Sequence, residues 1–157
     1  MEKARRVFVH LMAAVLVGVF VMAAAMPAFA ATTAKGKWYQ SGNGAWWYHY
    51  DSGGNPQGSW EKIDDKWYYF NDDGYAVAGW QKISERWYYF DASCAMITGW
   101  WVSPQNLYYY FDSGSGAMAE GWRNLDGKWY YFYPGYGHMA VNTYIDGYYI
   151  NAAGVWQ

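Results

Sequence analysis

Gly79-Trp80-Gln81-Lys82-Ile83-Ser84-Glu85-Arg86-Trp87-Tyr88-Tyr89-Phe90 repeats, with few changes, the preceding stretch at residues 58–70. The pattern returns at residues 99–111 and 121–132. The first tryptophans of the four copies are Trp60, Trp80, Trp100 and Trp122, which lie 20, 20 and 22 residues apart. A fixed period of about twenty residues is typical of proteins built from one small repeated unit.

Each copy is predicted to form a β-hairpin. The run Trp-Tyr-Tyr-Phe at residues 67–70 favours a strand, and Asp-Asp at 64–65 favours a tight turn before it. A later copy has Asp-Gly at 126–127, which is a strong hairpin signal. Because side chains alternate along a strand, we expect Trp67 and Tyr69 on one face and the tyrosine between them on the other.

The hairpins are expected to stack on one another. A two-stranded hairpin alone is only marginally stable in water, so each copy must bury its aromatic face against a neighbour. The predicted fold class is therefore all-β, a repeat solenoid of stacked β-hairpins. The repeat array is expected to span residues 36–157. Its five units would be residues 36–57, 58–77, 78–97, 98–119 and 120–141, followed by a partial unit as a terminal cap.

Residues 1–30 have the features of a signal peptide. Three basic residues precede an apolar stretch at 7–25, and Ala-Phe-Ala at 28–30 supplies the small, spaced residues that a signal peptidase accepts. We expect cleavage after Ala30, secretion, and a short tether at 31–35. The alternative is an uncleaved membrane anchor, because the apolar stretch approaches the roughly 20 residues that span a bilayer. The membrane would then be contacted through this leader alone.

Composition limits the classes of partner. All 12 Trp and all 18 Tyr lie beyond residue 30. The formal net charge is -2 and becomes more negative when the basic leader is removed, which disfavours nucleic acid as a partner. Cys94 is the only cysteine, so no internal disulfide can form and stability must come from packing between repeats. The sequence leaves open whether Cys94 joins two chains or is an incidental substitution.

The repeated motifs resemble a known family. Gly-Trp-Gln-Lys-Ile at 79–83, Trp-Tyr-Tyr-Phe at 87–90 and Gly-Ala-Met at 116–118 closely resemble the choline-binding, cell-wall-binding repeats of Gram-positive surface proteins. The resemblance extends over essentially the whole chain beyond the leader. It implies that choline groups of teichoic acid lie between successive units. Each group would be enclosed by two aromatic residues of one repeat and one of the next, often beside a methionine.

The resemblance implies five candidate cages when it is carried over residue by residue. They are Trp60 and Trp67 with Tyr89, Trp80 and Trp87 with Tyr110, Trp122 and Trp129 with Tyr149, Trp38 and Trp47 with Tyr69, and Trp100 and Tyr108 with Tyr131. The last of these departs from the pattern, because Tyr108 stands where the others have tryptophan. The methionine position is filled by Met96, Met118 and Met139, and by Ala76 in an earlier unit. Cys94 stands where other units have glycine.

The chemistry of a quaternary ammonium group suits such a cage. This group cannot donate a conventional hydrogen bond, so aromatic faces recognise it through their quadrupoles, at about 0.5–2 kcal/mol per contact. The alternative is that the rings only form the stacking core. We expect that core role for the phenylalanines at 70, 90, 111 and 132, and for Tyr68, Tyr88 and Tyr130.

The sequence favours a non-catalytic secreted protein that attaches non-covalently to the cell wall through choline groups of teichoic acid. The alternative is a carbohydrate-binding module in which the same tryptophans stack on glucan or wall polysaccharide. An enzyme is disfavoured, because His49 and His138 occupy repeat positions and no cluster has metal-ligand or phosphate-loop spacing. No catalytic residue, metal or cofactor is therefore expected. An open edge at either end of the array leaves room for a homodimer.

Overall fold

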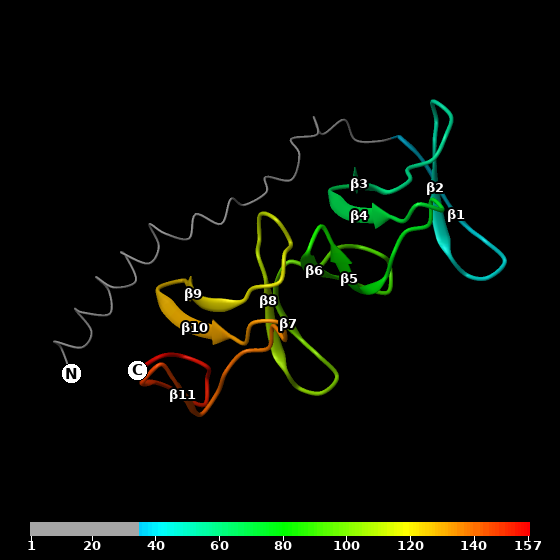
Figure 1. Ribbon diagram of the computed structural model, residues 1–157. Helices are drawn as coiled ribbons and strands as arrows, with labels where there is room; N and C mark the ends of the chain where they lie inside the picture. Colours follow the sequence, from blue (N-terminus) through cyan, green and yellow to red (C-terminus); the bar gives the residue numbers. More distant parts are fainter. Residues whose placement is uncertain (1–34) are drawn as a thin grey trace. The chain divides into compact units, whose positions relative to one another are not determined.

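The computed structural model describes residues 35–157, which form an all-β array (Figure 1). Its strands pair as six antiparallel hairpins, and no helix occurs in this part of the chain. The hairpins are β1 (Gly36–Gln40) with β2 (Trp46–Tyr50), β3 (Ser59–Ile63) with β4 (Lys66–Phe70), β5 (Gly79–Ile83) with β6 (Arg86–Phe90), β7 (Gly99–Val102) with β8 (Tyr108–Phe111), β9 (Gly121–Leu125) with β10 (Lys128–Phe132), and β11 (Thr143–Ile145) with β12 (Tyr148–Ile150). The predicted fold class of stacked hairpins is confirmed. The predicted leader, and the tether except for its last residue, lie outside the described residues.

Two-residue turns set the register of four hairpins. In the β3–β4 hairpin, Asp64 and Asp65 have φ angles of 47° and 64°. Two successive residues in this left-handed region form a type I′ turn, whose twist matches that of the flanking strands. The resulting register places Trp60 opposite Tyr69. The same turn occurs at Ser84–Glu85, Asp126–Gly127 and Asp146–Gly147.

The other two hairpins have longer turns, at residues 41–45 and 103–107. Each is closed by a backbone hydrogen bond across the turn: the N–H of Ser41 donates to the carbonyl of Ala45, and the N–H of Ser103 donates to that of Leu107, both at 2.9 Å. The extra residues change the sequence spacing between the two strands. Equivalent positions in these hairpins are therefore found from strand pairing and not from residue counting.

A short segment after each hairpin joins it to the preceding one. Following β6, the N–H of Met96 donates to the carbonyl of Trp67 in the preceding hairpin at 2.8 Å, while Met96 also bridges to Phe90 of its own hairpin. The same hydrogen bond recurs at the other junctions, from Ala76 to Trp46, Met118 to Trp87, Met139 to Tyr108 and Trp156 to Trp129. Successive hairpins are thus tied together by backbone bonds whatever the side chain at this position.

The core is a column of fully buried side chains, one per repeat. Phe70, Phe90, Phe111, Phe132 and Ile150 each have 0% of their surface exposed. Tryptophans of the preceding hairpin cover the phenylalanines. The ring centroids of Trp60 and Phe90, for example, are 5.7 Å apart. The predicted core role of the phenylalanine column is confirmed, and each of the four middle hairpins buries its own phenylalanine beneath a ring of the preceding hairpin.

Replacement of Phe90 by alanine is expected to lower the free energy of unfolding by about 3–5 kcal/mol, because it opens a cavity beneath Trp60 at a closely packed junction. Denaturant unfolding of the full chain, followed by tryptophan fluorescence, measures this change. Tyr144→Ala is the control, because the Tyr144 side chain is 70% exposed and should cost less than about 0.5 kcal/mol. Equal losses in the two variants would contradict the assignment of Phe90 to the core.

Candidate functional site

Strand pairing places two aromatic rings on the same face of each hairpin. In the β5–β6 hairpin, Trp80 pairs with Tyr89 and Lys82 pairs with Trp87, so both tryptophans project from one face. Their ring centroids are 6.3 Å apart and their planes meet at 85°. Two rings at this angle form adjacent walls of a box.

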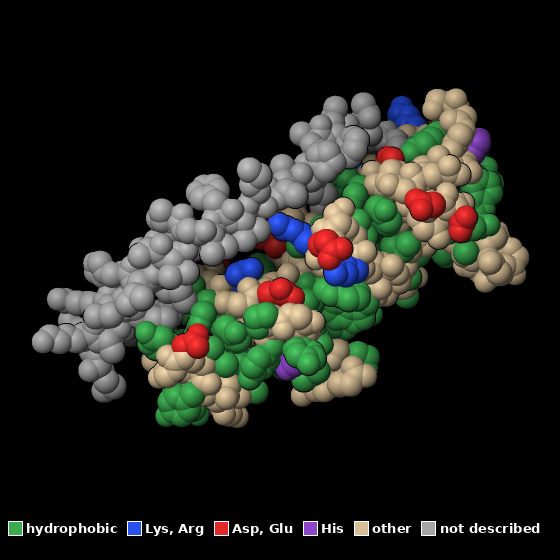
Figure 2. Space-filling view, viewed as in Figure 1, with side chains coloured by type: hydrophobic (Ala, Val, Ile, Leu, Met, Phe, Trp, Pro, Cys, Tyr) green, Lys and Arg blue, Asp and Glu red, His purple; other side chains and the backbone are tan. Residues whose placement is uncertain are grey.

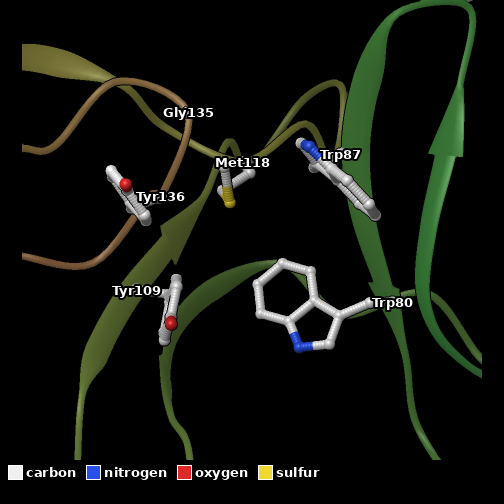
Figure 3. A pocket seen from close by; sticks show the side chains of 6 residues that line it. All are labelled: Trp80, Trp87, Tyr109, Met118, Gly135 and Tyr136. Atoms are coloured by element: carbon white, nitrogen blue, oxygen red, sulfur yellow. The ribbon is translucent and has the colours of Figure 1, made fainter.

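The first cavity, here called the upstream pocket, is built on these two tryptophans. Tyr109 of the next hairpin supplies a third ring, 5.1 Å from Trp80 and inclined at 63° to it. Met118 completes one side, and its backbone N–H donates to the carbonyl of Trp87 at 2.8 Å. The cavity has a volume of about 280 Å³ and is also lined by Gly135 and Tyr136. Figure 3 shows the rings and the methionine sulfur around a common space.

The second cavity, the downstream pocket, repeats this arrangement one hairpin later. Trp100, Tyr108, Tyr130 and Met139 take the places of the two tryptophans, the tyrosine and the methionine. The centroids of Trp100 and Tyr130 are 5.0 Å apart, and the N–H of Met139 donates to the carbonyl of Tyr108 at 2.7 Å. The volume is about 330 Å³, and Val102, Ala152 and Ala153 complete the lining. The change from tryptophan to Tyr108 therefore preserves the pocket.

The structure corrects which tyrosine accompanies each pair. The family resemblance groups Tyr110 with Trp80, but Tyr110 lies 5.4 Å from Trp100 in its own hairpin. A tyrosine opposite a tryptophan in the same ladder shares its face, whereas the tyrosine one residue earlier projects toward the preceding hairpin. The same shift replaces Tyr69 by Tyr68 beside Trp38, Tyr89 by Tyr88 beside Trp60, Tyr131 by Tyr130 beside Trp100, and Tyr149 by Tyr148 beside Trp122.

The first hairpin requires a second correction. Trp46, and not the predicted Trp47, is the equivalent of Trp67, because its carbonyl accepts the junction hydrogen bond from Ala76 at 2.8 Å. Trp47 stacks instead on Tyr39, with ring centroids 4.7 Å apart and planes at 19°. The five-residue turn between β1 and β2 displaces the aromatic run by one position, which residue counting could not reveal.

At two other junctions, a tryptophan of the predicted group lies beside the tyrosine that precedes the predicted one. Trp60 lies 4.9 Å from Tyr88, and the junction bond places Met96 beside Trp67. At the last junction Trp122 is 6.3 Å from Tyr148. There Trp156 occupies the methionine position, and its N–H donates to the carbonyl of Trp129 at 3.0 Å. The repeat pattern did not identify Trp156 as a residue of this group, because Trp156 lies in the terminal cap, whose sequence differs from that of the other units.

Two departures from the repeat pattern, Ala76 in place of methionine and Cys94 in place of glycine, meet at the same junction. In later units the methionine packs against a glycine of the next turn. A Cβ built on Gly116 would lie 2.3 Å from the sulfur of Met96. At the equivalent junction the glycine is replaced by Cys94 and the methionine by Ala76, and the Cys94 thiol donates to the carbonyl of Ala76 at 3.8 Å. The cysteine side chain thus occupies space that a methionine would need.

Cys94 is consequently a buried side chain. It is 5% exposed and packs in a cluster with Tyr68 and Phe70. Burial, with a smaller contribution from the nearby Asp91 carboxylate, raises the pKa of the Cys94 thiol above its ordinary value. The thiol therefore stays protonated and poorly reactive in the folded chain.

The electrostatics of the pockets come from rings and not from ionised groups. Among residues 35–157, no Lys, Arg, Asp or Glu side chain lines either pocket. Burial raises the pKa of Tyr109, so its hydroxyl remains neutral at physiological pH. Figure 2 shows hydrophobic side chains over much of one face, with charged groups scattered among them. The pockets can attract a cation through aromatic quadrupoles, but they offer nothing to hold an anion.

The described residues hold neither a metal-site cluster nor a membrane-spanning helix. Between residues 35 and 157 no three His, Cys, Asp or Glu side chains converge as a metal site would require. No helix in this part of the chain is long and apolar enough to cross a membrane. His49 is hydrogen-bonded through Nδ1 to Asn55 Oδ1 at 2.8 Å and lines neither pocket.

Family models match the part of the chain that supplies most of the aromatic rings of these pockets. The choline-binding repeat matches residues 57–82 and 77–121, and the cell wall binding repeat matches residues 120–134. These ranges include Trp80 and Trp87 of the upstream pocket, and Trp100 and Tyr108 of the downstream pocket. The search of curated proteins gave no match.

Solved structures share the hairpin array. Choline binding protein F from Streptococcus pneumoniae aligns with a TM-score of 0.73 and 41% identity, over 78% of this chain and 40% of its own. The modular autolysin LytC from the same species, in complex with a synthetic peptidoglycan ligand, gives 0.61 and 30%, over 79% and 28%. The endolysin of phage Cp-1 complexed with choline gives 0.57 and 36%, over 81% and 38%. The chain thus spans 40% or less of the length of these relatives.

Ala76→Met is expected to cost about 1–3 kcal/mol of unfolding free energy, because the longer side chain would overlap Cys94. Adding Cys94→Gly should restore part of this loss, with a coupling of about 0.5–3 kcal/mol in a double-mutant cycle of denaturant unfolding. Adding Cys94→Ala instead should restore less, because alanine keeps the Cβ that obstructs a methionine. Additive effects of Ala76→Met and Cys94→Gly would show that the two residues do not share this space.

Proposed function

Because the chain belongs to the family of choline-binding, cell-wall-binding repeats, we propose that it is a non-catalytic attachment protein whose inter-hairpin pockets bind the choline groups of wall teichoic acid. One observation carries the proposal. In the upstream pocket, three aromatic rings from two hairpins and a methionine enclose a space that no ionised side chain of the described part of the chain lines. Such a box suits a trimethylammonium group.

The affinity of one pocket follows from its walls. Each aromatic face contributes about 0.5–2 kcal/mol to a cation, more as the cation is desolvated. The methionine adds polarisable contact area without a hydrogen-bonding group. The rings of Trp80 and Trp87 are 38% and 36% exposed, so a ligand can reach them and cover them further. Three faces then give a weak but specific site.

Repetition converts weak pockets into firm attachment. The upstream and downstream pockets lie on successive hairpins, and a teichoic acid presents choline groups along one polymer. Once one choline is bound, the next binding step is intramolecular, and the combined affinity can exceed that of either site by about 10²–10⁴. The array is therefore suited to holding a protein at the wall.

Carbohydrate binding is the rival function. A sugar ring is best held on a flat aromatic platform flanked by hydrogen-bonding side chains. The pocket rings meet at 85° and 63°, which makes a box and not a platform. The geometry thus favours a cation over a sugar. Titration with choline and with wall polysaccharide distinguishes the two ligands.

Location follows from the same proposal. We expect the chain to be secreted through residues 1–30 and to remain non-covalently attached to the wall. We also expect no catalysis by this chain, since His49 and His138 line neither pocket and the proposed role needs no bond to be broken. Homodimer formation stays a prediction of the sequence.

Calorimetric titration of the full chain with choline tests the proposal. We expect saturable binding that weakens in a Trp80→Ala, Trp87→Ala double variant. It should be lost when choline is replaced by 3,3-dimethyl-1-butanol, which has the same shape but no charge. Trp47→Ala is the matched control, because Trp47 stacks on Tyr39 outside both pockets. Absence of heat with choline, together with binding to glucan or purified wall polysaccharide, would make the tryptophans sugar-binding platforms and overturn the proposal.

A further inference from the structure

Each pocket receives a further wall from the hairpin two steps along the chain. In the upstream pocket this wall is Gly135 and Tyr136, from the turn that follows β10. In the downstream pocket it is Ala152 and Ala153, from the turn that follows β12. This further wall comes from the equivalent turn in both pockets, but it carries a tyrosine in one and an alanine in the other.

We propose that Tyr136 is a fourth aromatic wall that makes the upstream pocket the tighter site for small quaternary ammonium groups and restricts the entry of bulkier ones. This inference rests on the proposed function, because it assigns different strengths to two pockets for the same class of ligand. Tyr136 is then a specificity-determining residue, and the array holds unequal sites.

Backbone hydrogen bonds hold the turn that presents Tyr136. The N–H of Gly135 donates to Oε1 of Glu120 at 2.9 Å. The N–H groups of Tyr136 and Gly137 both donate to the carbonyl of Tyr133, at 3.1 and 2.7 Å. A wall fixed in this way costs little conformational entropy when a ligand arrives.

Close packing fixes where the turn meets the pocket. A Cβ built on Gly137 would lie 2.1 Å from the sulfur of Met118, so only glycine lets the turn approach this methionine so closely. Gly137 also has a φ of 74°, which side chains rarely adopt. The preceding residue, Tyr136, is thereby brought to the pocket edge. Figure 3 shows its ring across the cavity from Trp87.

Packing within the fold covers little of the Tyr136 side chain. It is 74% exposed, although it belongs to the lining of an aromatic cavity. The pocket that it lines has a volume of about 280 Å³, against about 330 Å³ for the pocket with alanine. A bound cation would cover the exposed ring and add one more cation–π contact.

Site-resolved titration tests this inference. The full chain is labelled with ¹³C at the methionine methyl groups and titrated with choline, so that Met118 reports the upstream pocket and Met139 the downstream pocket. Tyr136→Ala should weaken binding about threefold to tenfold at Met118 and leave Met139 unchanged. Ala153→Tyr should strengthen binding at Met139 alone. Tyr144→Ala, which removes a similarly exposed tyrosine (70%) from neither pocket, should change neither titration.

A bulkier probe tests selectivity in the same samples. Tetrapropylammonium should bind the upstream pocket less well, relative to choline, than it binds the downstream pocket, and Tyr136→Ala should remove this difference. Unchanged choline binding at Met118 in Tyr136→Ala would overturn the fourth wall while leaving the proposed function intact. Absence of any choline-dependent shift at Met118 and Met139 in the unaltered chain would overturn both.

Discussion

A two-stranded hairpin has two faces and cannot bury either one by itself. In this array one face of each hairpin covers the phenylalanine of the next, as Trp60 covers Phe90. The junction hydrogen bond, such as that from Met96 to Trp67, holds the two hairpins together. Stability is therefore a property of neighbouring units and not of single ones.

The pockets are a consequence of the same stacking. Trp80 covers the buried Phe111, with ring centroids 5.7 Å apart, while its exposed edge faces the cavity. Trp87 and Met118 extend that cavity outward from the core. One interface thus supplies both the packing that stabilises the array and the aromatic walls that suit a cation. A substitution in these rings is expected to affect folding and binding together, which makes residues such as Tyr136 better probes of binding.

The sequence was sufficient to predict the repeat and the hairpins, because these depend on short-range signals, whereas the aromatic cages came from the resemblance to the family. The turn at Asp64–Asp65 follows from two residues that tolerate positive φ. The tyrosine grouping was predicted wrongly because it depends on which strand face meets the neighbouring hairpin. Tyr109 and Tyr110 are chemically identical, and only alternation along the strand separates them. Contacts between neighbouring units, such as Met118 with Gly137, leave no signal within one unit.

The junctions between repeats tolerate different side chains at the methionine position. Backbone bonds define each junction, so the side chain at the methionine position can be Ala76 or Trp156 without loss of the bond. A change at this position is matched by a change beside it: Cys94 fills space next to the small side chain of Ala76, where other units pair a glycine with a methionine. The pockets share a plan but differ in their walls, and we expect them to differ in affinity for the same polymer.

Intermolecular nuclear Overhauser effects on the full chain saturated with choline test the central claim most directly. The account predicts contacts from the choline methyl protons to the rings of Trp80, Trp87 and Tyr109, and to the methyl group of Met118. It predicts no contact with Tyr110, which faces the next junction. Contacts with Tyr110 in place of Tyr109, or with none of the rings that line the two pockets, would contradict it.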